Sequence, residues 1–269
     1  MTTSSQRTLF GIDLQLAQLY GENYTCLPNT TLNEKFNILP EINVTPGTYP
    51  TLKYITIGNG GNLQIPDSEN FIYNEHSPLD GALFNHIPFI IKTIDNDLSE
   101  IERMKYRFRV EKTINDTLYA CYYLRVIPSN LYDQKFYKIT TVNGENYLKL
   151  FKTNDPSILN PVPRTRKLSI DSLNSTEFVT KLVRFKLEFS AAEVKELENV
   201  YNILGHSQQL MTEIGLCTGI DYTGYGPTEA SCVQIAFHIG INLDLTNSFR
   251  TEAAITKYIE LGGSEALIY

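Results

Sequence analysis

The sequence predicts an α+β protein with a mainly antiparallel β-sheet core, a few packed helices and an extended N-terminal arm. Its 269 residues are 42% hydrophobic, which is enough for one large core or two smaller ones. Short β-rich runs alternate with turn-forming residues along most of the chain. One of these runs leads directly into a helix with clear start and stop signals, at residues 183–204.

The N-terminal region is predicted to hold a helix and an arm. Residues 6–20 read as an amphipathic helix that Gly21 ends, because four apolar residues recur at spacings of three and four: Leu9, Ile12, Leu16 and Leu19. The segment that follows, to Pro50, is rich in loops and proline and has little core of its own. This segment either extends as an arm onto a neighbouring protein or wraps over the main domain of its own chain. We therefore expect a helix and Pro-rich extended arm at 1–50, and a β-rich domain at 51–269.

The β-rich domain is expected to begin with a strand at 52–57 that ends in a sharp Gly-Asn-Gly-Gly turn. Residues 83–94 form an apolar extended run, in which Pro88 predicts an edge position or a bulge. Asp97 is expected to cap a short helical segment that continues through Met104.

Two hairpins are predicted to make a long insertion near residues 100–165. Their strands are expected at 106–113, 118–127, 135–142 and 147–151. The turn Asn143-Gly144 is the strongest short-range hairpin signal in the chain. Residues 154–176 then read as a Pro-rich loop or linker, and its basic run at 164–167 reads as a solvated loop.

The clearest pattern is a strand followed at once by a helix. The strand is predicted from apolar residues that alternate with charged ones: Val183, Phe185, Leu187 and Phe189. Ser190 and Glu193 form a capping box for a helix at 190–204, which Gly205 ends. The remaining elements are expected to be a strand at 210–216, a Gly/Tyr loop at 218–228, a strand at 232–241 and a final helix near 250–260.

Charge and composition argue against several classes of protein. The net charge is −7, so nucleic-acid binding, which needs clustered Lys and Arg, is not expected. The sequence shows neither a signal peptide nor an apolar run of the roughly 18 residues that a membrane helix needs. Cys121 and Cys232 lie in apolar strand-like runs and are expected to be buried, reduced thiols.

The search for catalytic or metal-binding patterns yields structural interpretations instead. Pro66 follows the glycine turn at 58–61 too closely for a phosphate-binding helix, so we interpret that turn as structural. Asp95-Asn96-Asp97 lacks the other ligand positions of a calcium loop and reads as a turn. The histidines (His76, His86, His206 and His238) lack metal-ligand spacing, and His86 reads as a core or interface histidine. We therefore predict no catalytic residue, no cofactor and no metal.

Two short motifs lie far apart in the sequence. Residues 54–61 read Tyr-Ile-Thr-Ile-Gly-Asn-Gly-Gly, and residues 213–216 read Glu-Ile-Gly-Leu. They resemble the opening strand with its Gly-rich turn and the later Glu-Ile-Gly-Leu of many tailed-phage tail-fibre and baseplate attachment domains. Residues 184–189 are similar to the strand that precedes the second motif in that family, and 217–219 depart from the acidic turn expected after it. The resemblance covers about a fifth of the chain.

The resemblance implies a structural virion protein, assembled in the host cytoplasm, that joins baseplate or tail components, with fibre attachment as one such role. Its implied partners are other virion proteins, in an oligomer or a large assembly without nucleic acid or membrane. A glycan-binding module of a receptor-binding apparatus is the alternative, with the loop at Tyr222–Tyr225 as its candidate feature. A hydrolase whose site assembles only in space is a third reading.

We interpret the residues of both motifs as fold-specifying rather than catalytic. They are Ile57, Gly58, Gly60, Gly61, Glu213, Ile214, Gly215 and Leu216. The glycines are expected to permit positive φ angles and close backbone approach at a strand end. Ile214 and Leu216 are expected to point inward from one face of a strand, with Gly215 leaving room for a neighbour.

Overall fold

The computed structural model describes residues 4–64, 71–128, 132–143, 145–150, 177–206, 209–224, 226–251 and 254–266. The chain divides into two compact units. The first comprises Met1–Pro128 and Phe189–Ile255, and the second comprises Ser129–Glu188 and Thr256–Tyr269. The predicted α+β class with an antiparallel sheet core is confirmed.

Among the residues that the structure describes, helices are few and all lie in the first unit. They are α1 (Leu9–Tyr20), α2 (Leu32–Phe36), α3 (Glu100–Arg103), α4 (Ala191–Leu204) and α5 (Thr246–Thr251), with a 3-10 turn η1 (Ile94–Asn96). None of the helices in the described ranges is both long enough and apolar enough to span a membrane.

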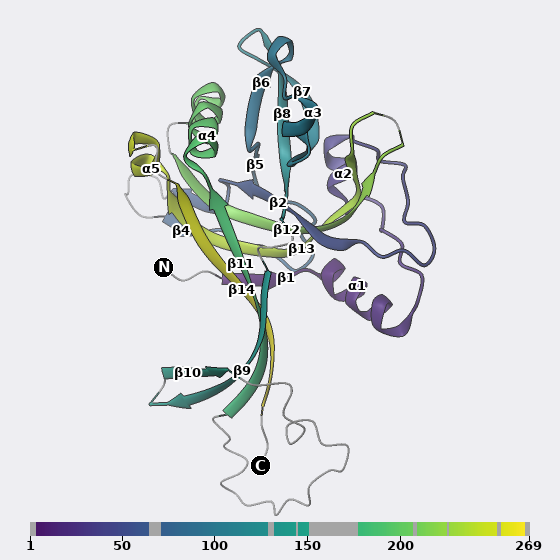
Figure 1. Cartoon of the computed structure of the whole chain (residues 1–269), viewed down its shortest axis with the longest axis vertical. Coiled ribbons are helices and arrows are strands. Elements are labelled where there is room, and N and C mark those ends of the chain that lie inside the picture. The colour runs from purple at the N-terminus through teal and green to yellow at the C-terminus, as the bar shows by residue number, and fades with distance from the viewer. Residues whose placement is uncertain are drawn as a thin grey trace, which may run out of the picture. The chain divides into compact units, whose positions relative to one another are not determined.

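The main sheet has eight strands, all paired antiparallel, in the order β1-β13-β12-β2-β8-β6, with β5 beside β2 and β7 beside β8 (Figure 1). Its strands are β1 (Ser4–Arg7), β2 (Thr51–Gly58), β5 (His86–Ile87), β6 (Ile90–Thr93), β7 (Tyr106–Ile114), β8 (Thr117–Val126), β12 (Leu210–Tyr222) and β13 (Glu229–Asp244). A small separate sheet pairs β3 (Asn62–Gln64) with β4 (Phe71–Tyr73).

The second unit contains a four-stranded sheet in the order β10-β9-β11-β14. Its strands are β9 (Tyr132–Val142), β10 (Glu145–Leu150), β11 (Glu177–Phe189) and β14 (Ile255–Ala266), of which Phe189 and Ile255 belong to the first unit. The predicted hairpin of β9 and β10 is confirmed, and Asn143 at its turn has a φ of 52°. The basic run at 164–167 and the loop around it lie outside the described residues.

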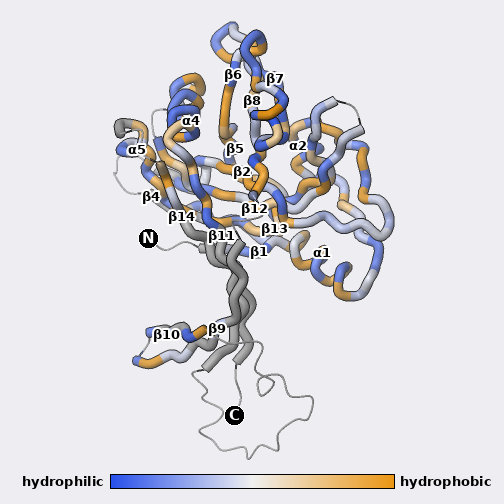
Figure 2. The backbone as a smooth tube through the Cα atoms, in the orientation of Figure 1, coloured by the Kyte–Doolittle hydropathy of each residue, from blue (hydrophilic) through white to orange (hydrophobic). Residues whose placement is uncertain are grey.

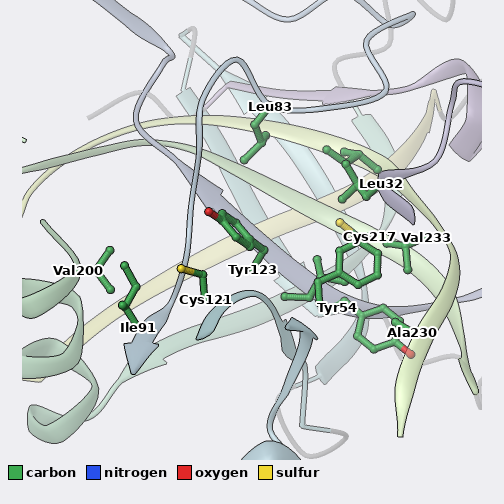
Figure 3. Packing of buried hydrophobic residues seen from close by; sticks show 13 residues of the cluster. Leu32, Tyr54, Leu83, Ile91, Cys121, Tyr123, Val200, Cys217, Ala230 and Val233 are labelled. Carbon is green, nitrogen blue, oxygen red and sulfur yellow. The ribbon is translucent and has the colours of Figure 1, made fainter. Parts of the chain in front are cut away.

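The core of the first unit forms between the sheet and the helices that cover it. Both α1 and α2 pack against β13, whereas α4 packs against β6. The main cluster brings Leu32 of α2 and Val200 of α4 together with Tyr54, Tyr123 and other buried strand residues (Figure 3). Figure 2 shows that hydrophobic residues recur along these strands and along α1. The predicted burial of Cys121 and Cys232 as free thiols is confirmed.

Local signals correctly predicted several elements. Asn115 and Asp116, at the turn between β7 and β8, both have positive φ, which a type I′ hairpin turn requires. Pro88 separates β5 from β6, as expected for a proline that cannot donate to a strand ladder. The capping box of Ser190 and Glu193 starts α4, and Gly205 ends it in the left-handed conformation.

Three predictions of local structure were wrong. Asp97, expected to cap the helix that ends near Met104, does not do so. The N-cap of α3 is Ser99, which forms a capping box with Glu102, and the Asp97 carboxylate instead accepts hydrogen bonds from Arg109 and Tyr122. The loop expected to begin at 218 starts later, because β12 continues to Tyr222 alongside β13. The helix expected near 250–260 is a shorter helix, α5, followed by strand β14, because a distant strand supplies its pairing partner.

The segment predicted as an arm packs on the first unit, as the second of the two expected alternatives requires. The amide of Asn33 joins α2 to β13: its nitrogen donates to the carbonyls of Ile38 and Ala230, and its oxygen accepts from the Val233 N–H at 2.8 Å. Asn33 is only 2% exposed, so water cannot replace these bonds.

Replacing Asn33 by alanine is expected to lower the free energy of unfolding by about 2–4 kcal/mol, because three backbone groups lose this hydrogen-bond partner and two of these bonds are buried. Urea titration followed by circular dichroism measures the loss. The control is Asn43→Ala, at an exposed position of the same segment, which should change stability by less than about 0.5 kcal/mol. Equal effects of the two substitutions would show that the segment is not anchored through α2.

Candidate functional site

The two sequence motifs meet across neighbouring strands. In the register between β2 and β12, Gly58 lies opposite Glu213 and Ile57 lies opposite Ile214. Ile57, Ile214 and Leu216 are all fully buried, so the alternate residues of the second motif point inward as predicted. A Cβ on Gly215 would lie 2.7 Å from the Thr56 methyl carbon, so this position needs glycine for close packing.

Glu213 is the centre of this arrangement. Although it is charged, it is only 1% exposed. Its Oε1 accepts hydrogen bonds from the backbone N–H groups of Gly60 at 2.6 Å and Asn85 at 3.3 Å. Its Oε2 accepts from the Phe84 N–H at 2.9 Å and from Nε2 of His76 at 2.7 Å. Four donors thus replace water around one buried carboxylate.

The glycines of the turn are required because the backbone approaches Glu213 closely. A Cβ on Gly58 would lie 2.5 Å from the Asn85 carbonyl oxygen, and one on Gly60 would lie 2.8 Å from the Asn85 nitrogen. A Cβ on Gly61 would lie 2.9 Å from Cγ of Glu213. None of the three has φ in the left-handed region, so the expected role of positive φ was wrong, and close approach alone explains them.

His76 links Glu213 to a second carboxylate. Its Nδ1 lies 3.2 Å from Oδ2 of Asp80, while its Nε2 faces Glu213. Its ring is stacked between Phe84, at a centroid distance of 4.1 Å, and His238, at 3.9 Å. The side chains of His76 and Glu213 are 6% and 2% exposed. Other groups of the chain therefore contact both faces of the His76 ring and both oxygens of the Glu213 carboxylate.

Two further histidines are neutral in the same region. His86 accepts the Leu83 N–H at Nε2, so its Nδ1–H donates to the Thr56 hydroxyl. Burial lowers the pKa of His86 to about 3, and the pKa of His238 to about 4. The reading of His86 as a satisfied core histidine therefore agrees with its contacts.

A second charged cluster lies at the far end of β12. Asp221 accepts from the Tyr54 hydroxyl at 2.8 Å and from the guanidinium of Arg107, and it pairs with Lys53 at 3.3 Å. Burial opposes its ionisation, but these donors hold the pKa of Asp221 below its usual range. Nη1 of Arg107 also donates to three backbone carbonyls at residues 103, 104 and 106.

An open hollow of about 480 Å³ lies next to this cluster. It lies between α3 and the loop at 226–228 and is lined by Glu100, Ile101, Arg103, Met104, Arg107, Gly226, Pro227 and Thr228. Ile101 is 80% exposed and Met104 is 70% exposed, which is high for large apolar side chains. The lining of the hollow therefore combines Arg107, whose guanidinium is hydrogen-bonded within the chain, with the exposed apolar side chains of Ile101 and Met104.

Sequence reasoning found the motif residues but missed their partners. His76, Asp80, Asp221 and Arg107 gave no local signal, because their contacts form only in the folded chain. In the glycan candidate loop, Tyr222 is partly exposed and lies against Gly224, while Tyr225 is outside the described residues. Within the described ranges, no group of three or more His, Cys, Asp or Glu side chains is arranged to hold a metal ion.

Comparison with known proteins gives one match. The chain belongs to a family of unknown function (DUF7208), whose model matches residues 1–269. Neither a curated protein nor a solved structure matches it.

Glu213→Gln is expected to lower the free energy of unfolding by about 2–4 kcal/mol. The glutamine amide has the same shape as the carboxylate, but its NH2 group would replace one carboxylate oxygen and face N–H donors there. The charge-assisted hydrogen bonds to the carboxylate would also be lost. Chemical denaturation measures the change, and Glu41→Gln, at an exposed carboxylate, should have almost none. A fully stable Glu213→Gln variant would contradict the role assigned to this carboxylate.

The low pKa values of His86 and His238 predict a loss of stability in acid. In the unfolded chain both side chains take up a proton near pH 6.5, whereas the folded chain keeps His86 neutral until about pH 3 and His238 neutral until about pH 4. Stability from this source is therefore complete above about pH 6.5 and falls as pH decreases, by about 3 kcal/mol at pH 4 for His86. Denaturant titrations between pH 7 and pH 4 should show a shallower decrease for His86→Gln. Identical slopes for variant and wild type would rule out this contribution.

Proposed function

We propose that this chain is a non-enzymatic structural protein of a tailed-phage particle, which joins baseplate or tail components through protein–protein contacts. The observation that carries the proposal is the pairing of residues 54–61 with residues 213–216. These are the two motifs that resemble tail-fibre and baseplate attachment domains, and they are paired at one place in the fold. The hydrogen bond from the Gly60 N–H to the Glu213 carboxylate then joins the turn of one motif to the strand of the other.

The state of the polar groups supports a role without catalysis. A general base or nucleophile needs a free lone pair that faces a space where substrate can enter. Glu213 and His76 are buried with their oxygen and nitrogen atoms engaged, and Arg107 at the hollow donates to Asp221 and to carbonyls. These groups hold the backbone in place rather than facing a ligand.

The hollow beside α3 supports contact with a neighbouring protein. Interface cores contain apolar and aromatic side chains with few unpaired charges, and large exposed apolar residues gain free energy when a partner covers them. Ile101 and Met104 are such residues, and Pro227 adds a rigid apolar wall. We therefore assign this surface to contact with another virion subunit.

The glycan-binding alternative concerns the same part of the chain, because Pro227 and Thr228 of the hollow lie in the connection that begins after Tyr222, at the end of β12. A sugar would need hydrogen-bonding groups together with an aromatic face. Glu100 and Thr228 supply such groups in the lining. Glycan binding by the purified chain, lost in Tyr222→Ala, would favour this alternative over the structural role.

The proposal predicts that purified particles contain the chain and that an altered α3 surface prevents its incorporation. The double variant Ile101→Asp with Met104→Asp should reduce incorporation about tenfold or more, since two charges would be buried at the contact. Mass spectrometry of particles assembled with each variant measures this. The control is Leu27→Asp, at an exposed leucine far from α3 in sequence, which should be incorporated normally.

Two results would contradict different parts of the proposal. Absence of the wild-type chain from purified particles would overturn the virion role itself. Normal incorporation of the double variant, with the chain present in particles, would overturn only the contact assigned to α3. Because both substituted side chains are mostly exposed, the variant is expected to fold, and an unchanged melting temperature checks this.

A further inference from the structure

Helix α1 has two apolar faces, and the chain buries only one of them. The buried face consists of Phe10, Gly11, Leu14 and Ala17, and it packs on β13. The packing is close: a Cβ on Gly11 would lie 2.8 Å from the Ala236 carbonyl oxygen. This face is therefore fixed to the sheet and unavailable to a partner.

The opposite face is the one whose spacing predicted the helix. Its members are Leu9, Ile12, Leu16 and Leu19, which are 47%, 37%, 47% and 76% exposed. Tyr20 extends the same face and is 72% exposed. We refer to these five residues as the α1 stripe. The helix predicted at 6–20 is confirmed over Leu9–Tyr20, while Gln6 and Arg7 belong to strand β1.

The spacing of the stripe is that of a seam between two helices. Steps of three, four and three residues place Leu9 and Leu16 at one heptad position, and Ile12 and Leu19 at the other. Such a seam fits the holes of a facing helix with the same spacing, at a shallow crossing angle. Its matching partner is therefore another helix with leucine and isoleucine at the same steps.

The size of the stripe matches a small specific interface. Its exposed fractions correspond to about 500 Å² of apolar surface, which is as large as the greatest apolar patch on a typical monomer. Covering it on two molecules would bury about 1,000 Å², the lower bound for a specific contact. The edge strand β1 directly precedes α1 at the same margin of the sheet, and the strand order of the described residues ends there (Figure 1).

We propose that two copies of this chain associate through their α1 stripes, packed antiparallel about a two-fold axis. In this arrangement Leu9 of one copy faces Leu19 of the other, and Ile12 faces Leu16, so one stripe supplies both halves of the interface. The inference does not depend on the proposed function, because it rests on the exposure and spacing of the stripe in the single chain.

The same symmetry brings two like charges close together. Asp13 flanks the stripe near its middle and is exposed, so the two-fold axis places Asp13 of each copy near its counterpart. Their repulsion weakens the association. Removing this charge therefore strengthens a contact between two copies, whereas no such symmetric effect arises when the partner is a different protein.

Sedimentation velocity of the full chain, at concentrations from about 1 to 200 µM, tests the proposal. The wild type is expected to shift from one to two chains over this range. The double variant Leu16→Glu with Leu19→Gln remains a single chain throughout, and circular dichroism checks that its helix content is kept. Leu118→Glu, at an exposed leucine on β8, is the matched control and associates like the wild type.

Asp13→Asn provides a second measurement that does not disturb the apolar surface. It is expected to tighten association about threefold at low salt, and the gain should disappear at high salt. A wild type that stays a single chain at the highest concentration overturns the proposal and leaves the stripe to a helix of another protein. Association that survives the stripe double variant, or that is unaffected by Asp13→Asn at low salt, overturns it as well.

Discussion

Burial of the Glu213 carboxylate is the constraint on which the centre of the first unit depends. An ionised carboxylate away from water is stable only when donors surround both oxygens. Here they come from the turn after β2 and from residues 76–85, which reach Glu213 from positions far away in the sequence. The turn, the loop and β12 must therefore be in place together, because displacing any one leaves a buried charge without a partner. The glycine turn has little freedom to vary for the same reason, since side chains at its glycines would collide with this network.

The sequence alone could predict the strands and the turn around Glu213, but not the residues that donate hydrogen bonds to it. The strand ends, the glycine turn and the inward-facing Ile214 and Leu216 follow from period-two alternation and from turn chemistry, which are local. His76 meets Glu213 across 137 positions, and no pattern near either residue marks the meeting. The glycines of the turn at 58–61 show the same limit. Their presence predicted an unusual backbone conformation, but only the structure shows that neighbouring atoms approach their backbone closely and that their φ angles are not positive.

Elements were predicted well where one segment supplies its own signals. The capping box of α4 and the Asn-Asp turn between β7 and β8 are such cases. Asp97 misled because its carboxylate has stronger partners than a helix end, and β14 was missed because its pairing strand is distant in sequence. Helix α1 shows a subtler limit. Periodicity reveals that apolar residues share a face, but in a helix with two apolar faces it does not reveal which face the sheet covers.

The interior of the first unit holds hydrogen-bonded polar groups, whereas its surface carries exposed apolar side chains. Three ionisable side chains form their hydrogen bonds within the fold itself: Glu213, His76 and Arg107. Such a network holds the backbone around them in place. What the described surface offers instead is apolar area, on α1 and around α3. Apolar area releases free energy only when another surface covers it, and a rigid scaffold loses little conformational entropy when that happens. Polar groups that are hydrogen-bonded within the fold, beneath exposed apolar side chains, are thus the arrangement that the proposed structural role requires.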